Sequence, residues 1–450
     1  MKSLVARRRR GKALAGLVLV CLHFTTGAAA AQDVSVERFA TGLARRLGYG
    51  APFIPEKERA GHLRDFLAGQ SRQEIAPESF LSGSSALQLG RGPAEAGKAG
   101  AAIESPSAAG QAEYRFYVIR PGATRVAAQA KGGPQIWQLD ENAPMPVRPG
   151  SGWTGVEGPS QFLDAGEHRL KIALPPGGAL SGLSVSTPCV PPILPTQLAS
   201  PPGRLLFQDK TAAMVRALGR EDLLPPGGQQ PIAAQANQFG AGSNSIVLRP
   251  GDGAGDAGAL EASGERGTVQ FEITLPQAGV YTIQADISGS GTSTWDVNGC
   301  RAASLPGEGE GRAFRLQRVA TMRLSKGVQN LSAVLRRGTR LRRVILQNHS
   351  EDPSGYAAAA EQLGLAEGAP NAPVSEAALQ ANLSNPAMDE RRREFEAMDR
   401  DPGALPGPTA VATFFPMPDE PPEEPRLPSE TVEEPYDTPV SPFIPLPGVP

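Results

Sequence analysis

The sequence predicts a mainly β protein with helical connectors. Two antiparallel, jelly-roll-like β-sandwiches are expected to alternate with three short helix pairs, and a disordered tail is expected to follow. In residues 268–347, apolar and polar side chains alternate in runs that Gly, Pro or Asn-Gly interrupt, which is typical of half-buried strands joined by tight turns. Residues 114–185 repeat this pattern, and helical segments that end in Leu-Gly lie before, between and after the two stretches.

Composition agrees with ordered pieces joined by connectors. The 450 residues suffice for two or three domains, but 52 of them are Gly, 44 are Pro and only 5% are aromatic. Such a chain can form small cores in places but not throughout its length.

Residues 1–31 are expected to be a signal peptide. Arginines at 7–10 precede a short apolar run at 13–24, and alanines at 28–31 offer a cleavage site before Gln32. An apolar run of about 12 residues is too short to span a bilayer. Lipid attachment at Cys21 is the weaker alternative, because the two residues before it are not small. We therefore expect export to the periplasm, the cell surface or the medium, with no membrane span left after cleavage.

The charge of the mature chain argues against nucleic-acid binding. Without the signal peptide, the chain holds 38 Lys and Arg against 46 Asp and Glu. A dedicated nucleic-acid binder needs a basic face. The partners that we expect are instead an envelope polysaccharide or an envelope protein.

A pair of helices is expected before each sandwich and after the second one. Gly48, Gly219 and Gly364 each follow a Leu at the end of an apolar-periodic segment, where glycine can adopt the left-handed C-cap conformation. A unit of two short helices buries too little surface to stand alone, so the pairs should pack on a sandwich or on one another. The second helices are expected at 57–68, 230–238 and 374–383.

The two strand-rich stretches look like copies of one unit. Trp137 and Trp295 are each followed by an aliphatic residue two positions later and then by turn residues. Gly166 and Gly327 each open a further strand, and the final strand lies 17 residues after each glycine. This recurrence of turn chemistry, alternation and spacing predicts an internal duplication.

The domain organisation follows from these patterns. Residues 71–110 are mostly small, with one strand-like run at 86–89, and are expected to form a loose connector or a sheet edge. Pro and Glu in the tail prevent a core there. We expect a signal peptide at 1–31, a helix pair at 32–70, a flexible connector at 71–110, a first sandwich at 111–190, a linker and helix pair at 191–242, a second sandwich at 243–350, a helix pair and a charged helix at 351–400, and a Pro/Glu-rich disordered tail at 401–450.

The two cysteines left after export are Cys189 and Cys300. In an exported protein such a pair is a candidate disulfide, and here it would join two domains across 111 residues of chain. The alternative is that both are small, buried and unreactive residues.

The sequence offers little for catalysis. His62, His168 and His349 lie on separate elements, outside metal-ligand spacing of one another or of a cysteine. No Gly-x-Ser-x-Gly elbow occurs, and the Gly-rich loop at 251–258 does not open a helix after a strand. We therefore expect neither enzyme activity nor a cofactor or metal.

Calcium is the alternative that stays open, because it binds clustered oxygen ligands in loops. Asp252 and Asp256 in the Gly-rich loop could supply such oxygens, and so could Asp140, Glu141 and Asp164 in the first sandwich. Neither group forms a full ligand set by itself.

Trp153 is the candidate ligand-binding residue. It stands in a Pro- and Gly-rich loop, residues 149–155, that has no counterpart in the second copy. An exposed indole there could stack on the face of a sugar, or the side chain could close the end of the sandwich. Trp137 and Trp295 recur at one position of the repeat, which favours a core role for both.

The strand runs resemble known modules. Residues 279–285, the Trp295-Asp-Val-Asn-Gly turn and residues 324–331 are similar to carbohydrate-binding-module jelly rolls of bacterial secreted enzymes, and residues 114–118 with 163–170 are also similar to prepeptidase C-terminal β-sandwiches. The resemblance implies a β-sandwich fold and covers roughly 80 residues in each copy.

Two function classes remain from the sequence. The favoured one is a non-catalytic exported protein whose tandem sandwiches bind an envelope or extracellular polymer, such as a glycan, or a partner protein. The other is a structural spacer or scaffold subunit of a surface or secretion assembly, with the acidic Pro-rich tail making the contact.

Overall fold

The structure, a computed structural model of the chain, describes residues 33–95, 98–195, 198–201, 203–251, 258–307 and 313–400. The expected signal peptide, the expected tail and the loop acids Asp252 and Asp256 lie outside these ranges. In the described residues, no helix is long and apolar enough to cross a membrane.

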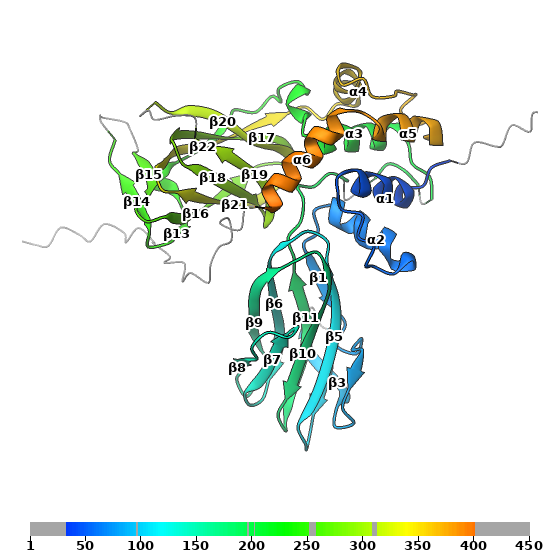
Figure 1. The fold of residues 1–450 in the computed structure, drawn as a ribbon, viewed down its shortest axis with the longest axis vertical. Coiled ribbons are helices and arrows are strands. Elements are labelled where there is room, and N and C mark those ends of the chain that lie inside the picture. Colours follow the sequence, from blue (N-terminus) through cyan, green and yellow to red (C-terminus); the bar gives the residue numbers. More distant parts are fainter. Residues whose placement is uncertain are drawn as a thin grey trace, which may run out of the picture.

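Sandwich 1 packs two antiparallel sheets face to face (Figure 1). In the described chain the larger sheet has the order β3-β4-β11-β6-β9, with β1 paired to β11, and the smaller has the order β2-β5-β10-β7-β8. Alternate side chains of both sheets point into one core, which includes Tyr114, Trp137 and Leu183. The strands are β1 (Arg72–Ile75), β2 (Ser82–Gly83), β3 (Gln88–Glu95), β4 (Lys98–Ser105), β5 (Gly110–Val118), β6 (Gly122–Lys131), β7 (Gln135–Leu139), β8 (Met145–Val147), β9 (Thr154–Leu163), β10 (Gly166–Leu174) and β11 (Gly178–Ser186).

Sandwich 2 repeats this topology strand for strand. Its larger sheet has the order β14-β15-β22-β17-β20, with β12 paired to β22, and its smaller sheet has the order β13-β16-β21-β18-β19. Each strand is therefore the counterpart of the strand numbered eleven lower. The strands are β12 (Ile232–Gln235), β13 (Ala241–Gly242), β14 (Ile246–Arg249), β15 (Ala259–Ala262), β16 (Arg266–Leu275), β17 (Gly279–Gly289), β18 (Thr292–Val297), β19 (Cys300–Pro306), β20 (Arg315–Leu324), β21 (Gly327–Arg336) and β22 (Thr339–His349).

The predicted duplication is confirmed at the two tryptophans. Trp137 on β7 and Trp295 on β18 occupy equivalent strands and are fully buried. The Trp137 indole N–H donates to Gln135 Oε1 at 3.0 Å, and the Trp295 indole N–H donates to Ser293 Oγ at 2.9 Å. Both partners lie two residues earlier on the same strand, so the core role expected for both tryptophans is also confirmed.

A shared turn after each tryptophan strand gives a second match. Asp140 and Asn298 both have φ of 51°, in the left-handed region that Asp and Asn tolerate. Asp140 Oδ1 accepts from the Arg169 N–H at 2.8 Å, and Asn298 Oδ1 accepts from the Asn330 N–H at 2.9 Å. Equivalent residues thus form the same side-chain to backbone bond in both copies.

Two expectations about local structure are wrong. Residues 71–110, expected as a flexible connector, form β1 to β4 of sandwich 1, and the register of β1 with β11 runs from Arg72 opposite Ser186 to Ile75 opposite Leu183. Residues 230–238, expected as a helix, form β12 and a short 3-10 turn η2 (Ala236–Gln238), with Ile232 opposite Leu346 on β22. Pairing with a strand more than 100 residues away outweighs weak local propensity in both places.

The helices of the described chain gather in one helical hub, defined here as α1 to α6 with η1 (Figure 1). Their apolar faces share a single core cluster, as expected for helix pairs that pack on one another. The predicted left-handed caps are confirmed, since Gly48, Gly219 and Gly364 have φ of 98°, 62° and 63°. The elements are α1 (Val36–Arg46), α2 (Glu56–Leu67), α3 (Phe207–Ala217), η1 (Glu221–Leu223), α4 (Pro353–Gln362), α5 (Glu376–Leu383) and α6 (Ala387–Asp399).

A ring of three backbone hydrogen bonds closes the hub. The Val34 N–H donates to the Val374 carbonyl at 3.1 Å, the Val374 N–H to the Leu205 carbonyl at 3.0 Å, and the Leu205 N–H to the Val34 carbonyl at 2.7 Å. Each residue lies two positions before a helix, namely α1, α3 or α5. The ring ties together segments that lie before sandwich 1, between the sandwiches and after sandwich 2.

Arg120 lies where the hub and both sandwiches meet. It follows β5 in sandwich 1 and is 1% exposed. Its guanidinium pairs with Asp399 on α6 and donates to the Cys189 carbonyl at 2.7 Å and to the Arg301 carbonyl of sandwich 2 at 3.4 Å. A single buried cation therefore contacts all three units.

A disulfide lies beside this junction. Cys189, in the segment after β11, is bonded to Cys300 at the start of β19, with 4.8 Å between the Cα atoms. The bond fastens the end of sandwich 1 to sandwich 2, and it joins the two domains in the way that the sequence left as one of two alternatives.

Candidate functional site

A polar cleft lies between sandwich 2 and the hub. Its volume is about 680 Å³. One wall is the outer face of the β17, β20 and β22 sheet, and the other is formed by the end of α3, η1 and α6. We call it the polar cleft; its lining is Leu218, Gly219, Arg220, Asp222, Thr282, Gln284, Arg318, Gln347, His349, Leu363, Ala387, Glu390, Arg391 and Glu394.

Strand alternation explains why the sheet wall is polar. Tyr281, Ile283 and Ala285 on β17 are buried in the core of sandwich 2, so Thr282 and Gln284 between them point outward. The register of β17 with β20 shifts between Ile283 and Gln284, which marks a β-bulge. Bulges bend a strand and redirect side chains, and they are common next to functional sites.

Sandwich 1 carries a smaller hollow on its equivalent face. The register of β6 with β9 shifts at the counterpart position, between Arg125 and Ala127. The hollow has a volume of about 440 Å³ and is lined by residues of β1, β6, β9 and β11, among them Arg72, Gln129 and Glu157. The repeat unit itself therefore shapes this face, and the hub adds the second wall in sandwich 2.

A row of hydrogen bonds fixes the floor of the polar cleft. His349 Nδ1 donates to the Leu224 carbonyl at 3.0 Å, and its Nε2 lies 2.7 Å from the Thr282 hydroxyl. Thr282 Oγ1 in turn lies 2.9 Å from Thr321 Oγ1. Both ring nitrogens of His349 are thus engaged, and the imidazole is held as a structural link between η1 and the sheet.

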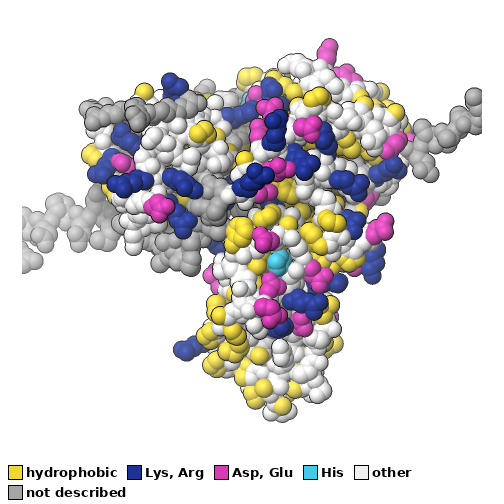
Figure 2. All heavy atoms as spheres, viewed as in Figure 1, with side chains coloured by type: hydrophobic (Ala, Val, Ile, Leu, Met, Phe, Trp, Pro, Cys, Tyr) yellow, Lys and Arg dark blue, Asp and Glu magenta, His cyan; other side chains and the backbone are white. Residues whose placement is uncertain are grey.

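The charges of the polar cleft balance. Asp222 pairs with Arg220 at 3.2 Å and with Arg318 at 2.8 Å, and Arg391 pairs with Glu394 at 2.6 Å. Together with Glu390, the lining holds three arginines and three carboxylates. Figure 2 shows Lys and Arg side chains beside Asp and Glu side chains where sandwich 2 meets the helices. In the described residues the amide of Gln284 forms no side-chain hydrogen bond, so it remains available to a ligand.

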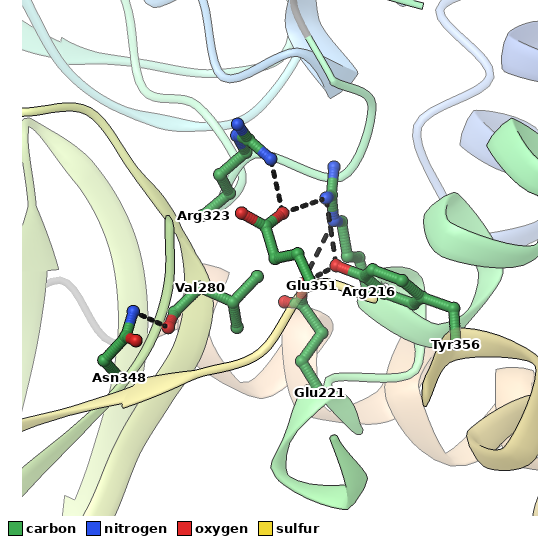
Figure 3. Close-up of polar contacts among 7 residues, drawn as sticks. All are labelled: Arg216, Glu221, Val280, Arg323, Asn348, Glu351 and Tyr356. Carbon is green, nitrogen blue, oxygen red and sulfur yellow. Dashed lines mark hydrogen bonds and ion pairs between the residues drawn. The ribbon is translucent and has the colours of Figure 1, made fainter. Parts of the chain in front are cut away.

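A buried ionic cluster lies behind the hub wall (Figure 3). Arg216 on α3 donates from Nε to Glu221 Oε1 at 3.0 Å and from Nη2 to the Tyr356 hydroxyl at 3.0 Å. The Tyr356 hydroxyl also bonds Glu221 Oε1 at 3.0 Å, and Glu351 links Arg216 to Arg323 of sandwich 2. Burial raises the pKa of Glu221 to about 7, although the Arg216 charge opposes this shift. Glu221 Oε2 has no partner among the described residues.

The structure places Trp153 away from the polar cleft. The residue lies in the loop between β8 and β9, at the end of sandwich 1 opposite the hub, and is half-buried. Lys131 Nζ sits 4.8 Å from the centre of its ring, and Lys131 also pairs with Glu104 at 3.1 Å. A cation thus occupies one position over the indole, and Trp153 stays a proposal as a ligand contact.

Two of the acidic residues weighed for calcium in sandwich 1, Asp140 and Glu141, have side-chain partners. Asp140 Oδ2 lies 2.8 Å from His168 Nδ1, and Glu141 lies 3.6 Å from Lys171 Nζ. The Asp164 carbonyl accepts from His168 Nε2 at 2.9 Å. Among the residues that the structure describes, no three His, Cys, Asp or Glu side chains are grouped as metal ligands.

The polar cleft itself could not be found from the sequence. Its sheet residues lie up to 67 positions apart, as for Thr282 and His349. In the sequence, each of them has the pattern of an outward-facing residue in an ordinary strand. The available signal is a difference between the copies: Thr282 and Gln284 are uncharged polar residues, whereas Arg125 and Ala127 occupy the counterpart positions on β6.

No family model matches the chain, and no curated protein matches it either. The solved structures that match include a family 35 carbohydrate-binding module from Clostridium thermocellum, which is 13% identical in sequence. The match covers 26% of this chain and 98% of that chain, with a TM-score of 0.23. A carbohydrate-binding module of lichenase 5A from Cellvibrio mixtus, in complex with cellotriose, matches with 16% sequence identity. This match covers 26% of this chain and 96% of that chain, with a TM-score of 0.22.

A mannanase from Podospora anserina that carries a carbohydrate-binding module also matches, with 14% identity, 27% of this chain and a TM-score of 0.24. This chain spans 28% of the length of that enzyme. The kind of module that the sequence pattern resembles is therefore among the matches, and the function proposed below depends on the geometry of this chain alone.

Proposed function

We propose that the chain is an exported, non-catalytic binding protein whose sandwich 2 holds a neutral, hydroxyl-rich polymer, such as an envelope or extracellular polysaccharide, in the polar cleft. The observation that carries the proposal is the lining of the cleft. Amide, hydroxyl and guanidinium groups converge there from three neighbouring strands and from the hub. Sites between two units are a common place for ligands.

Two features of the lining favour this ligand class. The balance of three arginines and three carboxylates gives no net attraction for a strongly charged polymer. The free Gln284 amide, the Gln347 amide and the Arg318 guanidinium offer donors and acceptors that suit adjacent hydroxyl groups. An apolar ligand would leave these groups without partners.

The non-catalytic part of the proposal is supported by His349. General acid or base catalysis requires a group within reach of the reacting proton. Both nitrogens of this imidazole are bound to the Leu224 carbonyl and the Thr282 hydroxyl, so neither is free to exchange a proton with a ligand.

The test is a glycan array probed with mature chain 32–450, followed by calorimetry on the best binder. Gln284→Ala and Arg318→Ala should each weaken binding on the order of tenfold, because each removes one or two direct hydrogen bonds. The matched control is Gln129→Ala in the hollow of sandwich 1, which should leave the affinity unchanged. Loss of binding in Trp153→Ala, with Gln284→Ala unaffected, would move the site to sandwich 1 and refute the proposed cleft.

A scaffold role is the second candidate, and the junction at Arg120 favours it. The buried arginine, the disulfide and the ring of backbone bonds hold the three units in one arrangement, as a spacer requires. In that role the acidic Pro-rich segment 401–450 would contact an envelope partner. The scaffold role would be favoured if the chain bound no glycan on the array and captured one envelope protein only when residues 401–450 were present.

A further inference from the structure

A groove opens at the side of sandwich 2, next to the end of α6. Its volume is about 310 Å³. The walls are residues 302–305 of β19, residues 318–321 of β20 and the last turn of α6, with Pro191, Pro192 and Ile193 at one end. Ala302, Val319 and Met398 are buried at its base, and Arg318, Arg391 and Glu394 add charged groups to its lining; we call this feature the edge groove.

Both strand walls of the edge groove are sheet edges. In the described chain β19 pairs with β18 on one side, and β20 pairs with β17 on one side. Open edges present backbone N–H and C=O groups that another strand can bind, and proteins usually cover or blunt them. Here they are long, since β20 runs over ten residues.

The tail of the same chain holds one segment suited to such an edge. Residues 409–415 read Thr-Ala-Val-Ala-Thr-Phe-Phe, which is rich in β-branched and aromatic residues and free of proline. Pro408 and Pro416 bound it, so its length is that of one strand. An acidic run follows at 419–424, which contains Asp419, Glu420, Glu423 and Glu424.

Chain connectivity and charge favour this segment as the occupant. Ala397 and Met398 on α6 line the groove, and the tail leaves α6 three residues later. Eight residues separate Arg400 from Thr409, and such a linker spans up to about 30 Å when extended. Residues 401–450 carry nine Asp and Glu against one Arg, whereas residues 241–350 carry nine Asp and Glu against thirteen Lys and Arg.

We propose that residues 409–415 of this chain dock in the edge groove of their own sandwich 2 as an added strand, next to Arg318 and Arg391. These two arginines line both the edge groove and the polar cleft. A strand added there would extend a sheet edge of sandwich 2 next to the proposed ligand site. The inference concerns the tail and holds whether or not the cleft binds a glycan.

Hydrogen exchange of the mature chain, followed by mass spectrometry, tests the docking. A tethered segment has an effective concentration near the millimolar range, so peptides from β19 and β20 should exchange on the order of tenfold more slowly in the natural chain than in the F414S/F415S variant. Both substitutions lie in the tail and leave the sandwich sequence intact. The matched control is F443S/I444S, an equally apolar pair further along the tail, which should exchange like the natural chain.

A photo-crosslinker at Thr413 identifies the occupant. The expected product is an intramolecular link to residues 302–305, 318–321 or 397–398 whose yield does not change with protein concentration. Links between two chains that increase with concentration would overturn the proposal in favour of a second copy. Equal exchange in the natural chain and F414S/F415S, with no link to the groove, would overturn it outright.

Discussion

Replacing Arg120 by methionine should loosen the junction of the three units. Methionine keeps much of the apolar stem but removes the guanidinium that pairs with Asp399 and donates to the carbonyls of Cys189 and Arg301. Removing one partner of a fully buried ion pair costs about 3–5 kcal/mol. The Asp399 side chain is 16% exposed and keeps the Tyr49 hydroxyl at 3.1 Å, so we expect about 2–3 kcal/mol, toward the low end.

Urea unfolding with two probes measures this loss. Far-UV circular dichroism at the helical band follows the hub, and tryptophan fluorescence follows the sandwiches, which contain Trp137, Trp153 and Trp295. With a denaturant slope of about 1–3 kcal/mol per molar, R120M should lower the hub midpoint by roughly 1–2 M. Removing both charges in R120M/D399L should recover more than half of the loss, since no unpaired buried charge remains.

The control is Arg125→Met on β6, where the side chain is exposed. This change should stay within about 0.5 kcal/mol of the natural chain, as surface substitutions usually do. If R120M behaves like R125M, the junction does not hold the hub in place and the reasoning about Arg120 is refuted.

Three further predictions concern the bridge, the repeat and the buried cluster. The double change C189S/C300S should lower the free energy of unfolding by about 2–4 kcal/mol. Peptide mapping of the natural protein without reduction should recover the peptides of Cys189 and Cys300 linked by a disulfide, and two free thiols there would contradict this. H168A should cost about 1–3 kcal/mol, and D140N/H168Q should recover most of that loss. In the other copy Gln329 accepts from the Asn298 amide and donates to the Ser325 carbonyl, and only an asparagine at 140 could donate in the same way; a loss in D140N/H168Q equal to that in H168A would contradict this. The pKa of Glu221 is raised from 4.5 to about 7 in the folded protein, so between these values the folded state binds more protons than the unfolded state. The free energy of unfolding should therefore fall as the pH rises from about 5 to about 7. E221Q should flatten this pH dependence, and an unchanged slope in E221Q would contradict the assignment to Glu221.

The sequence reveals those parts of the fold that repeat or alternate. Core positions such as Tyr281, Ile283 and Ala285 alternate with outward residues because each sheet buries one face. The left-handed glycines after α1, α3 and α4 follow from local chemistry, as do the turns after Trp137 and Trp295. Such signals are local, so they can be detected in the sequence without knowing which strand pairs with which.

Features that depend on distant pairing stay hidden. β3 and β4 contain Gly90, Ala101 and Ala102, whose intrinsic strand preference is low, yet they form a hairpin that extends the sheet from β11. Residues 232–235 are too short to distinguish a strand from a helix, and their pairing with β22 decides the outcome. The polar cleft depends on the strand register of sandwich 2 and on the packing of sandwich 2 against the hub. No local sequence pattern predicts either of these features.

The most direct measurement of the central claim is a hydrogen-exchange footprint of the best array glycan on residues 32–450. Binding in the polar cleft predicts slower exchange in residues 282–286, 316–321 and 345–349, with residues 149–156 around Trp153 unchanged. Protection confined to 149–156, or no protection at any glycan concentration that saturates binding, would contradict it.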